Sequence, residues 1–512
     1  MQTFLIGLVI LVAGGFFYGA YCQKIFSPDD RKTPAFEKQD GVDFVPMPKW
    51  KNALVNLLNI AGTGPILGPI QGILFGPVAF ITIPVGCIIA GAVHDYFSGM
   101  ISLREGGIQM PELIRRNSTS LIHKFYTVLV CLGLLLVGVV FTYTPGDITA
   151  TQVFGFAGTA KNPSTWIIYG VIFAYYLIAT LFPIDKIIGR VYPVFGAILL
   201  LSAVGIFVML FVKSAPLVNI WENWNLNGFD FKSYFTSEKF IPSFFITVAC
   251  GILSGFHSTQ VTLVTRTLES EKEGRFTFYN MMIAEGFIAM VWAAGTMAMI
   301  GFGAENAGLT MQMTDSGWSY FAMVGEQLQE ISATSVVGVV CKNMLGPVGG
   351  FVAIIGVILL PITSGDTALR SLRLIIAETF HVPQDKHKKR FMISLPIFAL
   401  TFLILVWAKI NTHNFHIIWR YFGWTNQTQA VFALSAITVW LMQHDKKRFL
   451  WVSLIPLMFY TFITHCYIFN AKIGFSLPLK LSCILGAVCS MAVIVFTLWV
   501  GFRKNGEIGE KK

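Results

Sequence analysis

Four ionisable side chains stand inside apolar stretches of the sequence, where burying a charge is costly. His94 and Asp95 lie in AGAVHDYFSGM, His257 lies in SGFHS, and Glu285 lies in IAEGF. An ionisable side chain within a membrane segment by default marks an ion or proton path. We expect His94, Asp95 and Glu285 to serve ion or proton coupling. His257, with an unperturbed imidazole pKa of about 6.5, is expected to bind a substrate carboxylate or to carry the coupled proton.

Structural roles are the alternatives for these side chains. Asp95 would then pair with a helix terminus and hold the bundle together, and His257 would be a satisfied structural histidine. Glu285 would pair with a polar group of the neighbouring helix.

Hydroxyl and carboxylate oxygens also gather in a later apolar stretch, LLPITSGDTALRSLRL. Thr363, Ser364 and Asp366, with the carbonyl oxygens of unwound backbone, would form an oxygen-rich cation site. Asp366 lies four residues before Arg370, so a buried ion pair is the alternative. We expect no cofactor, and we expect H+ rather than Na+ as the coupling ion.

Two glycine-rich interruptions of apolar helices form the candidate substrate site. The first, IAGTGPILGPIQGI, contains Gly62, Thr63, Gly64 and Pro65, and the second, ACGILSGFHS, contains Ser254, Gly255, His257 and Ser258. Glycine and proline weaken helix interiors, and broken helices persist in a membrane where they line a protein cavity. Backbone N–H groups at a half-helix N-terminus favour a carboxylate or another anion. Tight helix packing through small residues is the alternative.

The composition is that of a membrane protein. Of 512 residues, 54% are apolar and 12% are charged, whereas about 25% charged is usual for soluble domains. The net charge of +10 does not indicate nucleic-acid binding, because the basic residues fall between apolar runs. The eight cysteines form no CxxC pair, so neither a disulfide framework nor a zinc site is indicated. Residues 2–22 lack the basic start and cleavage motif of a signal peptide, which predicts a retained helix.

Apolar runs of about 20 residues can cross a bilayer, and they predict an all-α polytopic protein with about thirteen transmembrane helices. The predicted spans are 2–22, 53–77, 79–103, 121–143, 164–183, 190–213, 242–264, 277–302, 347–379, 391–410, 428–444, 449–469 and 481–502. Most of the 37 Lys and Arg residues fall in the segments 24–52, 104–124, 184–190, 265–276, 370–390, 445–448 and 503–512. The positive-inside rule makes these segments cytoplasmic. It places the N-terminus outside and the C-terminus in the cytoplasm.

The two interruptions open two groups of five spans, 53–213 and 242–444. The broken helix of the first group runs outward, and that of the second runs inward. Interrupted helices at matching positions of two oppositely oriented halves indicate an inverted-repeat secondary transporter. A single transporter domain would fill 1–512, with one extra N-terminal helix at 2–22 and two peripheral helices within 449–502.

Two further segments carry weaker signals. The segment 317–332, GWSYFAMVGEQLQEIS, is amphipathic and predicts a cap on the outer surface, with a simple long loop as the alternative. The segment WRYFGWTNQTQAVFAL places Asn426, Gln427 and Gln429 at the mouth of a span, where we expect interfacial anchoring.

These stretches together resemble the carbon starvation protein A (CstA) family of bacterial inner-membrane transporters. The matching segments are TPAFEKQDGVDFVP, NIAGTGPILGPIQGILFG, AGAVHDYFSGMISLREGG, ACGILSGFHS with GRFTFYNMMIAEGF, TSGDTALRSLRLIIAE and WRYFGWTNQTQAVFAL. The resemblance implies the APC superfamily and its LeuT-like five-plus-five repeat. It also implies uptake of small carboxylates or peptides during nutrient limitation, since relatives are associated with pyruvate, with protons and with peptides. His94 stands where the family commonly has Gln, and TQVTLVTRTLES replaces a run rich in Ser, Gly and Thr.

The sequence therefore predicts a secondary active transporter of the bacterial inner membrane, not an enzyme, that imports a pyruvate-like carboxylate or peptides. A peptide transporter and a sodium-coupled symporter of amino acids or organic acids are the alternatives. No GxxxxGK[ST] loop supports an ATP-driven pump, and no HExxH or GxSxG motif supports a hydrolase. A non-transporting nutrient sensor stays open, as does an intramembrane protease with Asp95 and Asp366 as its acid pair. The expected partners are the cargo and membrane lipid and not nucleic acid, and the sequence does not indicate an oligomeric state.

Overall fold

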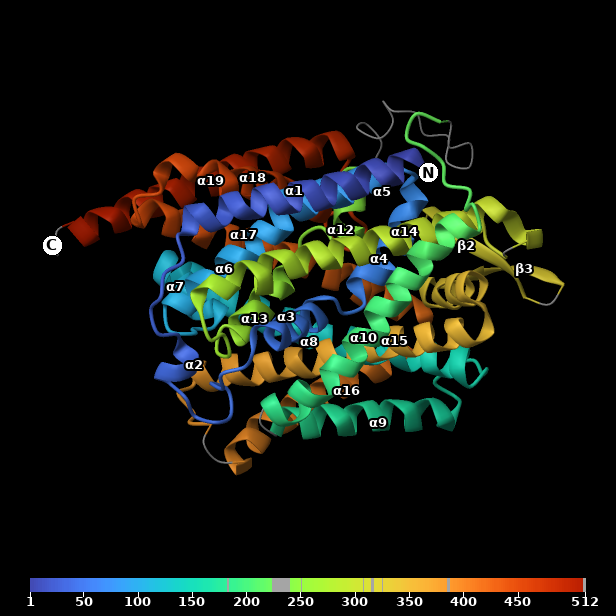
Figure 1. Cartoon of the computed structure of the whole chain (residues 1–512), viewed down its shortest axis with the longest axis horizontal. Coiled ribbons are helices and arrows are strands. Elements are labelled where there is room, and N and C mark those ends of the chain that lie inside the picture. The colour runs from blue at the N-terminus through green and yellow to red at the C-terminus, as the bar shows by residue number, and fades with distance from the viewer. Residues whose placement is uncertain are drawn as a thin grey trace.

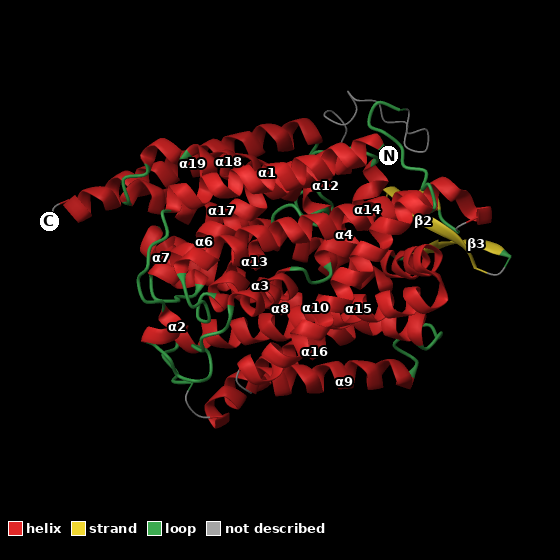
Figure 2. Ribbon diagram, viewed as in Figure 1, coloured by secondary structure: helices red, strands yellow, loops and turns green. Residues whose placement is uncertain are grey.

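The computed structural model is a bundle of long helices that run roughly along one axis (Figures 1 and 2). It describes residues 1–181, 184–222, 240–249, 251–306, 308–314, 317–324, 326–384 and 387–509. The short helices α2 (Pro34–Glu37) and α7 (Met110–Asn117) lie at one end, called here the α7 end. A small sheet lies at the opposite end, called the sheet end. The N-terminus is near the sheet end and the C-terminus extends from the α7 end.

The remaining helices fall into an early group and a late group along the chain. The early helices are α1 (Gln2–Phe26), α3 (Lys49–Ile60), α4 (Gly64–Gly72), α5 (Ala79–Gly86), α6 (Ala92–Arg104), α8 (Ser120–Ile148), α9 (Pro163–Leu181) and α10 (Ile184–Val212). The late helices are α12 (Ser243–Thr247), α13 (Gly255–Val264), α14 (Asn280–Asn306), α15 (Ala333–Thr379), α16 (His387–Ile410), α17 (Thr412–Gln443), α18 (Trp451–Asn470) and α19 (Leu479–Gly509). Short 3-10 or π turns are η1 (Ile73–Phe75), η2 (Cys87–Gly91), η3 (Thr149–Val153), η4 (Glu271–Glu273), η5 (Arg275–Tyr279) and η6 (Lys447–Phe449).

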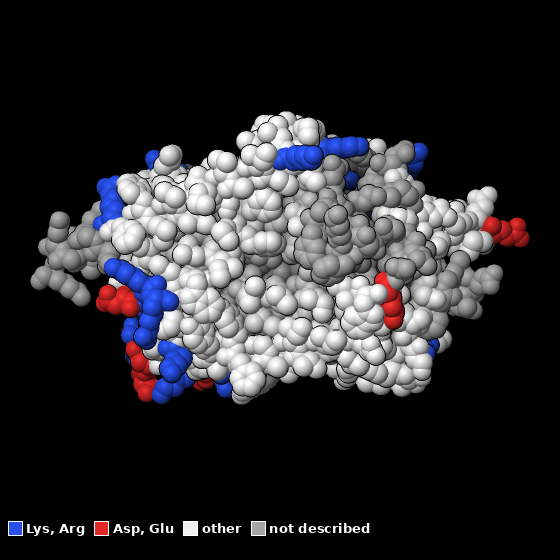
Figure 3. Space-filling model, turned by 90° about the horizontal axis from the view of Figure 1, so that it is seen from above, with Lys and Arg blue, Asp and Glu red and all other residues white. Residues whose placement is uncertain are grey.

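The surface between the two ends is apolar. On the peripheral helices α1 and α19, large side chains such as Val9, Phe17, Val488 and Val495 are more than half exposed. On the face seen in Figure 3, charged side chains gather at the α7 end, and a broad uncharged band adjoins them. Lipid-facing helices have this surface, because their backbone polar groups are satisfied internally and their side chains contact hydrocarbon. The chain is therefore a multi-pass membrane protein.

The predicted spans fall on helices of the structure. Among the described residues, ten helices are long and apolar enough to cross a membrane. The pair α3 and α4 with η1, bent by 48°, would make eleven. The segment with α12 and α13, and the helix α17, do not pass the same test. The count of thirteen and the division into two repeats stay predictions.

Two helices begin before the predicted spans that they contain. The helix α15 begins at Ala333, and Gly346, with φ of 71°, separates its two helical parts, so the predicted span 347–379 corresponds to the second part. Lys342 interrupts the apolar run, so the sequence did not predict the first helical part of α15 as a span. The helix α17 begins at Thr412 rather than at 428, because its first half is rich in polar and aromatic residues.

The segment predicted as an amphipathic cap or a long loop forms a sheet instead. Strands β1 (Thr310–Thr314), β2 (Gly317–Val324) and β3 (Gln327–Ile331) pair antiparallel in that order. The hydroxyl of Tyr320 in β2 donates to the carbonyl of Ile70 in α4. The sheet therefore packs against the helix that follows the first interruption.

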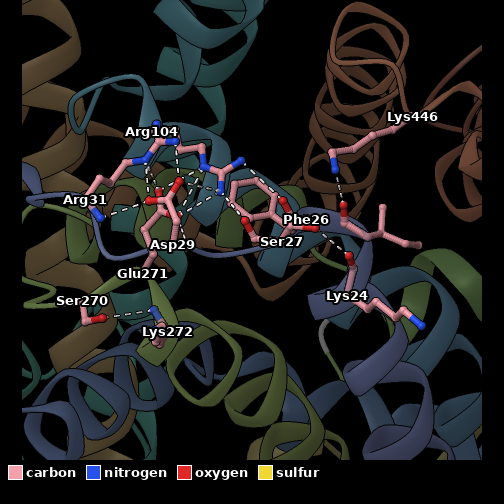
Figure 4. Close-up of polar contacts among 11 residues, drawn as sticks. Lys24, Phe26, Ser27, Asp29, Arg31, Arg104, Ser270, Glu271, Lys272 and Lys446 are labelled. Atoms are coloured by element: carbon pink, nitrogen blue, oxygen red, sulfur yellow. Dashed lines mark hydrogen bonds and ion pairs between the residues drawn. The ribbon is translucent and has the colours of Figure 1, made fainter.

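A network of charged side chains joins the end of α1 to α6 and η4 (Figure 4). Arg104 donates to the Ser27 carbonyl at 2.6 Å and from Nε to a Glu271 carboxylate oxygen at 3.0 Å. The Glu271 side chain is fully buried. Arg31 lies 3.4 Å from Glu271, and its hydrogen bonds to Asp29 lower the pKa of that carboxyl. We call Asp29, Arg31, Arg104 and Glu271 the Arg104 network.

Candidate functional site

The first break separates α3 from α4 at residues 61–63, and polar groups of α15 lie against it. The backbone N–H of Gly62 donates to the Ser364 hydroxyl at 3.1 Å, and that hydroxyl donates to the Leu58 carbonyl at 2.9 Å. The Thr363 hydroxyl donates to the Leu360 carbonyl within its own helix at 2.7 Å. The structure thus brings Ser364 to the first break, because α15 supplies the hydroxyl that the broken helix needs for its freed backbone groups.

The second break separates α12 from α13, and residue 250 within it lies outside the described residues. The Asn426 amide oxygen accepts from the Ser254 hydroxyl at 3.0 Å and from the Phe256 backbone N–H at 2.7 Å. The Gln427 amide donates to the Leu253 carbonyl at 2.8 Å. Asn426 and Gln427 are buried. The prediction that these amides anchor a helix at the membrane interface was wrong, since they satisfy the backbone of the second break.

The two breaks lie side by side. The Phe141 ring of α8 packs against Gly62, where a Cβ would be 2.4 Å from its Cζ atom, and its centroid lies 5.9 Å from the Phe256 ring. A Cβ added to Gly251 would lie 3.9 Å from the Cα of Pro65. Phe141 therefore stands between the two interruptions.

Three of the predicted coupling residues form one buried chain with His257. His94 Nδ1 lies 2.8 Å from Asp95 Oδ1, and His257 Nδ1 lies 3.0 Å from Asp95 Oδ2. The other ring nitrogen of His257 lies 3.6 Å from Glu285 Oε2. All four side chains are fully buried. We call His94, Asp95, His257 and Glu285 the Asp95 chain. It joins α6 to α13 and α14 and includes a residue of the second break.

The remaining predicted residues have separate surroundings. Asp366 accepts from the Tyr175 hydroxyl at 2.7 Å, so it contacts α9. Ser258 donates to the Gly255 carbonyl at 2.6 Å. A Cβ at Gly255 would lie 2.2 Å from the Asn426 carbonyl oxygen of α17, so close helix packing explains this glycine. Gly64, at the start of α4, is buried.

Two side chains at the first break are buried without a hydrogen-bond partner among the described residues. They are Thr63, through its hydroxyl, and Asn59, through both its amide nitrogen and its amide oxygen. Such atoms normally find a partner, so this is where a polar ligand would be held. The sequence did not single out Asn59. Its signal was an amide one helical turn before Thr63, in a helix that also carries Asn52 and Asn56.

Two arginines form ion pairs beside the loop between α1 and α3. Arg370 pairs with Asp43 at 3.3 Å, and Arg266 pairs with Glu378 at 3.2 Å and donates to the Gly107 carbonyl at 3.0 Å. Burial alone would raise the pKa of Asp43, but the nearby guanidinium groups, Arg370 foremost, hold it below its usual range. Ionised Asp43 therefore stabilises the folded chain.

The Asp43→Asn variant is expected to unfold at a lower temperature than the wild type at pH 7. A carboxyl with a depressed folded pKa stabilises above its unfolded pKa of about 3.9 and loses this contribution as the pH falls through the folded value. The difference should thus persist at pH 5 and shrink below pH 4 in thermal unfolding scans in detergent. A difference that is unchanged down to pH 3 would contradict the assignment. The exposed Asp30→Asn variant is the control.

Comparison with known proteins places the chain among membrane transporters. A family model described as carbon starvation protein CstA matches residues 1–146 and 127–466. A membrane protein of Haemophilus influenzae is 42% identical over 331 residues, which are 57% of this chain and 89% of that protein. The peptide transporter CstA of Escherichia coli is 24% identical over 86% of this chain and 76% of its own length. The pyruvate/proton symporter BtsT of Escherichia coli is 23% identical over 88% and 78%.

Solved structures resemble the fold. A manganese transporter of Eremococcus coleocola superposes with a TM-score of 0.54 at 11% identity, covering 91% of this chain and 99% of that one. A Na+-coupled sialic acid symporter superposes with a TM-score of 0.52 at 15% identity, covering 96% and 97%. These are LeuT-fold transporters, and likeness at this level of identity concerns the fold alone.

Proposed function

The chain belongs to the CstA family of carbon starvation proteins, and from this membership we propose that it imports a small, pyruvate-like carboxylate together with protons. The proposed setting is the bacterial inner membrane under nutrient limitation, with the N-terminus outside and the C-terminus in the cytoplasm. Curated relatives are named transporters, which fixes the coarse class as membrane transport. The five-plus-five inverted repeat, with breaks at Gly62 and Gly255, belongs to the same proposal.

The observation that carries the proposal is the position of the Asp95 chain. Its central imidazole, His257, belongs to the second break and lies between two buried carboxylates, at 3.0 and 3.6 Å. A protonated imidazole donates from both ring nitrogens, whereas a neutral one donates from only one. A proton on His257 would therefore be stabilised by Asp95 and Glu285 together.

Binding of the cargo's carboxylate would be linked to that proton by charge. The N-terminus of α4 at Gly64 and Pro65 presents a positive dipole end. Just before it lie the Asn59 and Thr63 side chains, which have no hydrogen-bond partner within the part of the chain that the structure describes. A carboxylate bound at the N-terminus of α4 adds one negative charge to a buried region. A proton bound to the Asp95 chain offsets one negative charge of that region. Each therefore favours the other in a low-dielectric interior, which is the requirement for symport.

Uptake of labelled pyruvate into proteoliposomes with the purified chain tests the proposal. An inward proton gradient should drive accumulation above the outside concentration, and collapse of the gradient should stop it. Uptake of di- or tripeptides but not pyruvate would favour a peptide transporter, the class named for several relatives. Dependence on sodium in place of protons would move the coupling role to Thr363 and Ser364. Binding without flux would favour the sensor.

A further inference from the structure

A continuous series of aromatic contacts extends from the two breaks. We call Phe256, Phe141, Phe422, Trp419, Phe415 and Tyr143 the aromatic column. Successive ring centroids lie 5.9 Å apart from Phe256 to Phe141, 6.1 Å from there to Phe422, and 5.6 Å from there to Trp419. The series continues at 6.2 Å from Trp419 to Phe415 and ends at 3.8 Å, with Phe415 stacked on Tyr143.

The aromatic column is half-buried at Phe415 and Trp419 and buried elsewhere. The exposed fractions of its other members are 7% at Tyr143, 4% at Phe422, 1% at Phe141 and 2% at Phe256. The column therefore connects the half-buried rings of α17 with the candidate substrate site.

A buried ion pair lies at the Tyr143 end of this column. Lys409 Nζ is 3.0 Å from Asp147 Oδ1 and 4.3 Å from the centre of the Tyr143 ring. The Thr334 hydroxyl donates to Asp147 Oδ2 at 3.0 Å. The Lys409 side chain is 3% exposed and that of Asp147 is 18% exposed. A Cβ at Gly158 would lie 3.1 Å from Asp147 Oδ1 and 3.5 Å from Lys409 Nζ, so the loop before α9 covers the pair.

We propose that Lys409 is an entry site for the carboxylate of the cargo, and that Asp147 holds this ammonium until the cargo replaces it. The proposal rests on the proposed function and deepens it. The Lys409 ammonium, the rings of the aromatic column and the two breaks then follow one another in order. The face of the Tyr143 ring stabilises the ammonium. The carboxylate is common to monocarboxylates and peptides, so the site serves either cargo.

An entry site and a merely structural ion pair predict different effects of two variants on the pyruvate concentration for half-maximal uptake. Lys409→Met removes the attracting charge and should raise the pyruvate concentration for half-maximal uptake about tenfold. Asp147→Asn removes the competing carboxylate and should lower it, by about threefold. Lys409→Arg keeps the charge and should stay near the wild type. The measurement is initial uptake into proteoliposomes, with thermal unfolding as a check on folding.

If the ion pair is only structural, Lys409→Met and Asp147→Asn should both impair uptake and both lower stability. That result would overturn the entry site. Half-saturation unchanged in Lys409→Met would overturn it as well. If Lys409→Met fails to fold, the direction of the Asp147→Asn shift decides. A wild-type protein that moves no carboxylate-bearing cargo would overturn the proposed function and this site together, whereas normal flux with unaltered variants overturns the site alone.

Discussion

Proteoliposomes that contain the Asp95→Asn variant are expected to lose proton-driven accumulation of pyruvate while retaining exchange of cargo across the membrane. Asparagine fills the same volume and can still accept a hydrogen bond, but it carries no charge for a protonated His257. Removing the nearer of the two carboxylates beside a buried cation costs about 3 kcal/mol, or about a hundredfold in the occupancy of the protonated state. Exchange needs no net proton movement and should survive.

The control is Asp30→Asn. The Asp30 side chain is 80% exposed and pairs with Lys272 at the surface, and exposed ion pairs contribute little to stability. This variant should accumulate pyruvate like the wild type. Accumulation of pyruvate against its concentration gradient by the Asp95→Asn variant would contradict the coupling role of the Asp95 chain. Loss of both accumulation and exchange would point instead to a structural role for Asp95.

Gly255→Ala is expected to destabilise the protein more than Gly62→Ala. The new Cβ at Gly255 would lie 2.2 and 2.4 Å from the Asn426 carbonyl oxygen and the Ala430 nitrogen, both backbone atoms of α17. The three atoms nearest to a Cβ at Gly62 all belong to the Phe141 ring, the first at 2.4 Å. Overpacking costs about 1 to 3 kcal/mol, and we expect the upper end or more where backbone must move.

Thermal unfolding of the two variants, alone and combined with Phe141→Leu, separates these cases. The smaller side chain should restore the stability of Gly62→Ala and leave Gly255→Ala unchanged. Gly170→Ala, at a helical glycine with open space around its Cβ position, should be as stable as the wild type or slightly more. Equal stability of Gly255→Ala and the wild type would show that the second break does not pack against α17 as described.

The sequence predicts the breaks and the buried ionisable residues because the rules behind them are local. The residues from Gly62 to Pro65 disfavour a regular helix in any tertiary context, and Asp95 within an apolar run requires polar partners. Which groups are those partners depends on the tertiary structure. The contact of Asp95 with His257, 162 residues later, was beyond reach from spacing alone.

The errors have the same origin. Asn426 and Gln427 resemble interfacial residues by composition, and only the packing of α17 against the second break reveals them as its hydrogen-bond partners. The strands at 310–331 were missed because an isolated amphipathic segment with few charges fits several structures. Their sheet becomes visible only through its register, for example Tyr320 opposite Met311 and Ile331.

The Arg104 network has a mechanical consequence. Its contacts fix the end of α1 to α6 and η4, and Lys446 adds a hydrogen bond to the Ile25 carbonyl at 2.5 Å. The helix α6 carries Asp95, and η4 follows the helix that carries His257. If these elements travel as one rigid body while the bundle rearranges, the distance between carboxylate and imidazole stays constant throughout the cycle. The proposed proton site would then keep its geometry while other helices move.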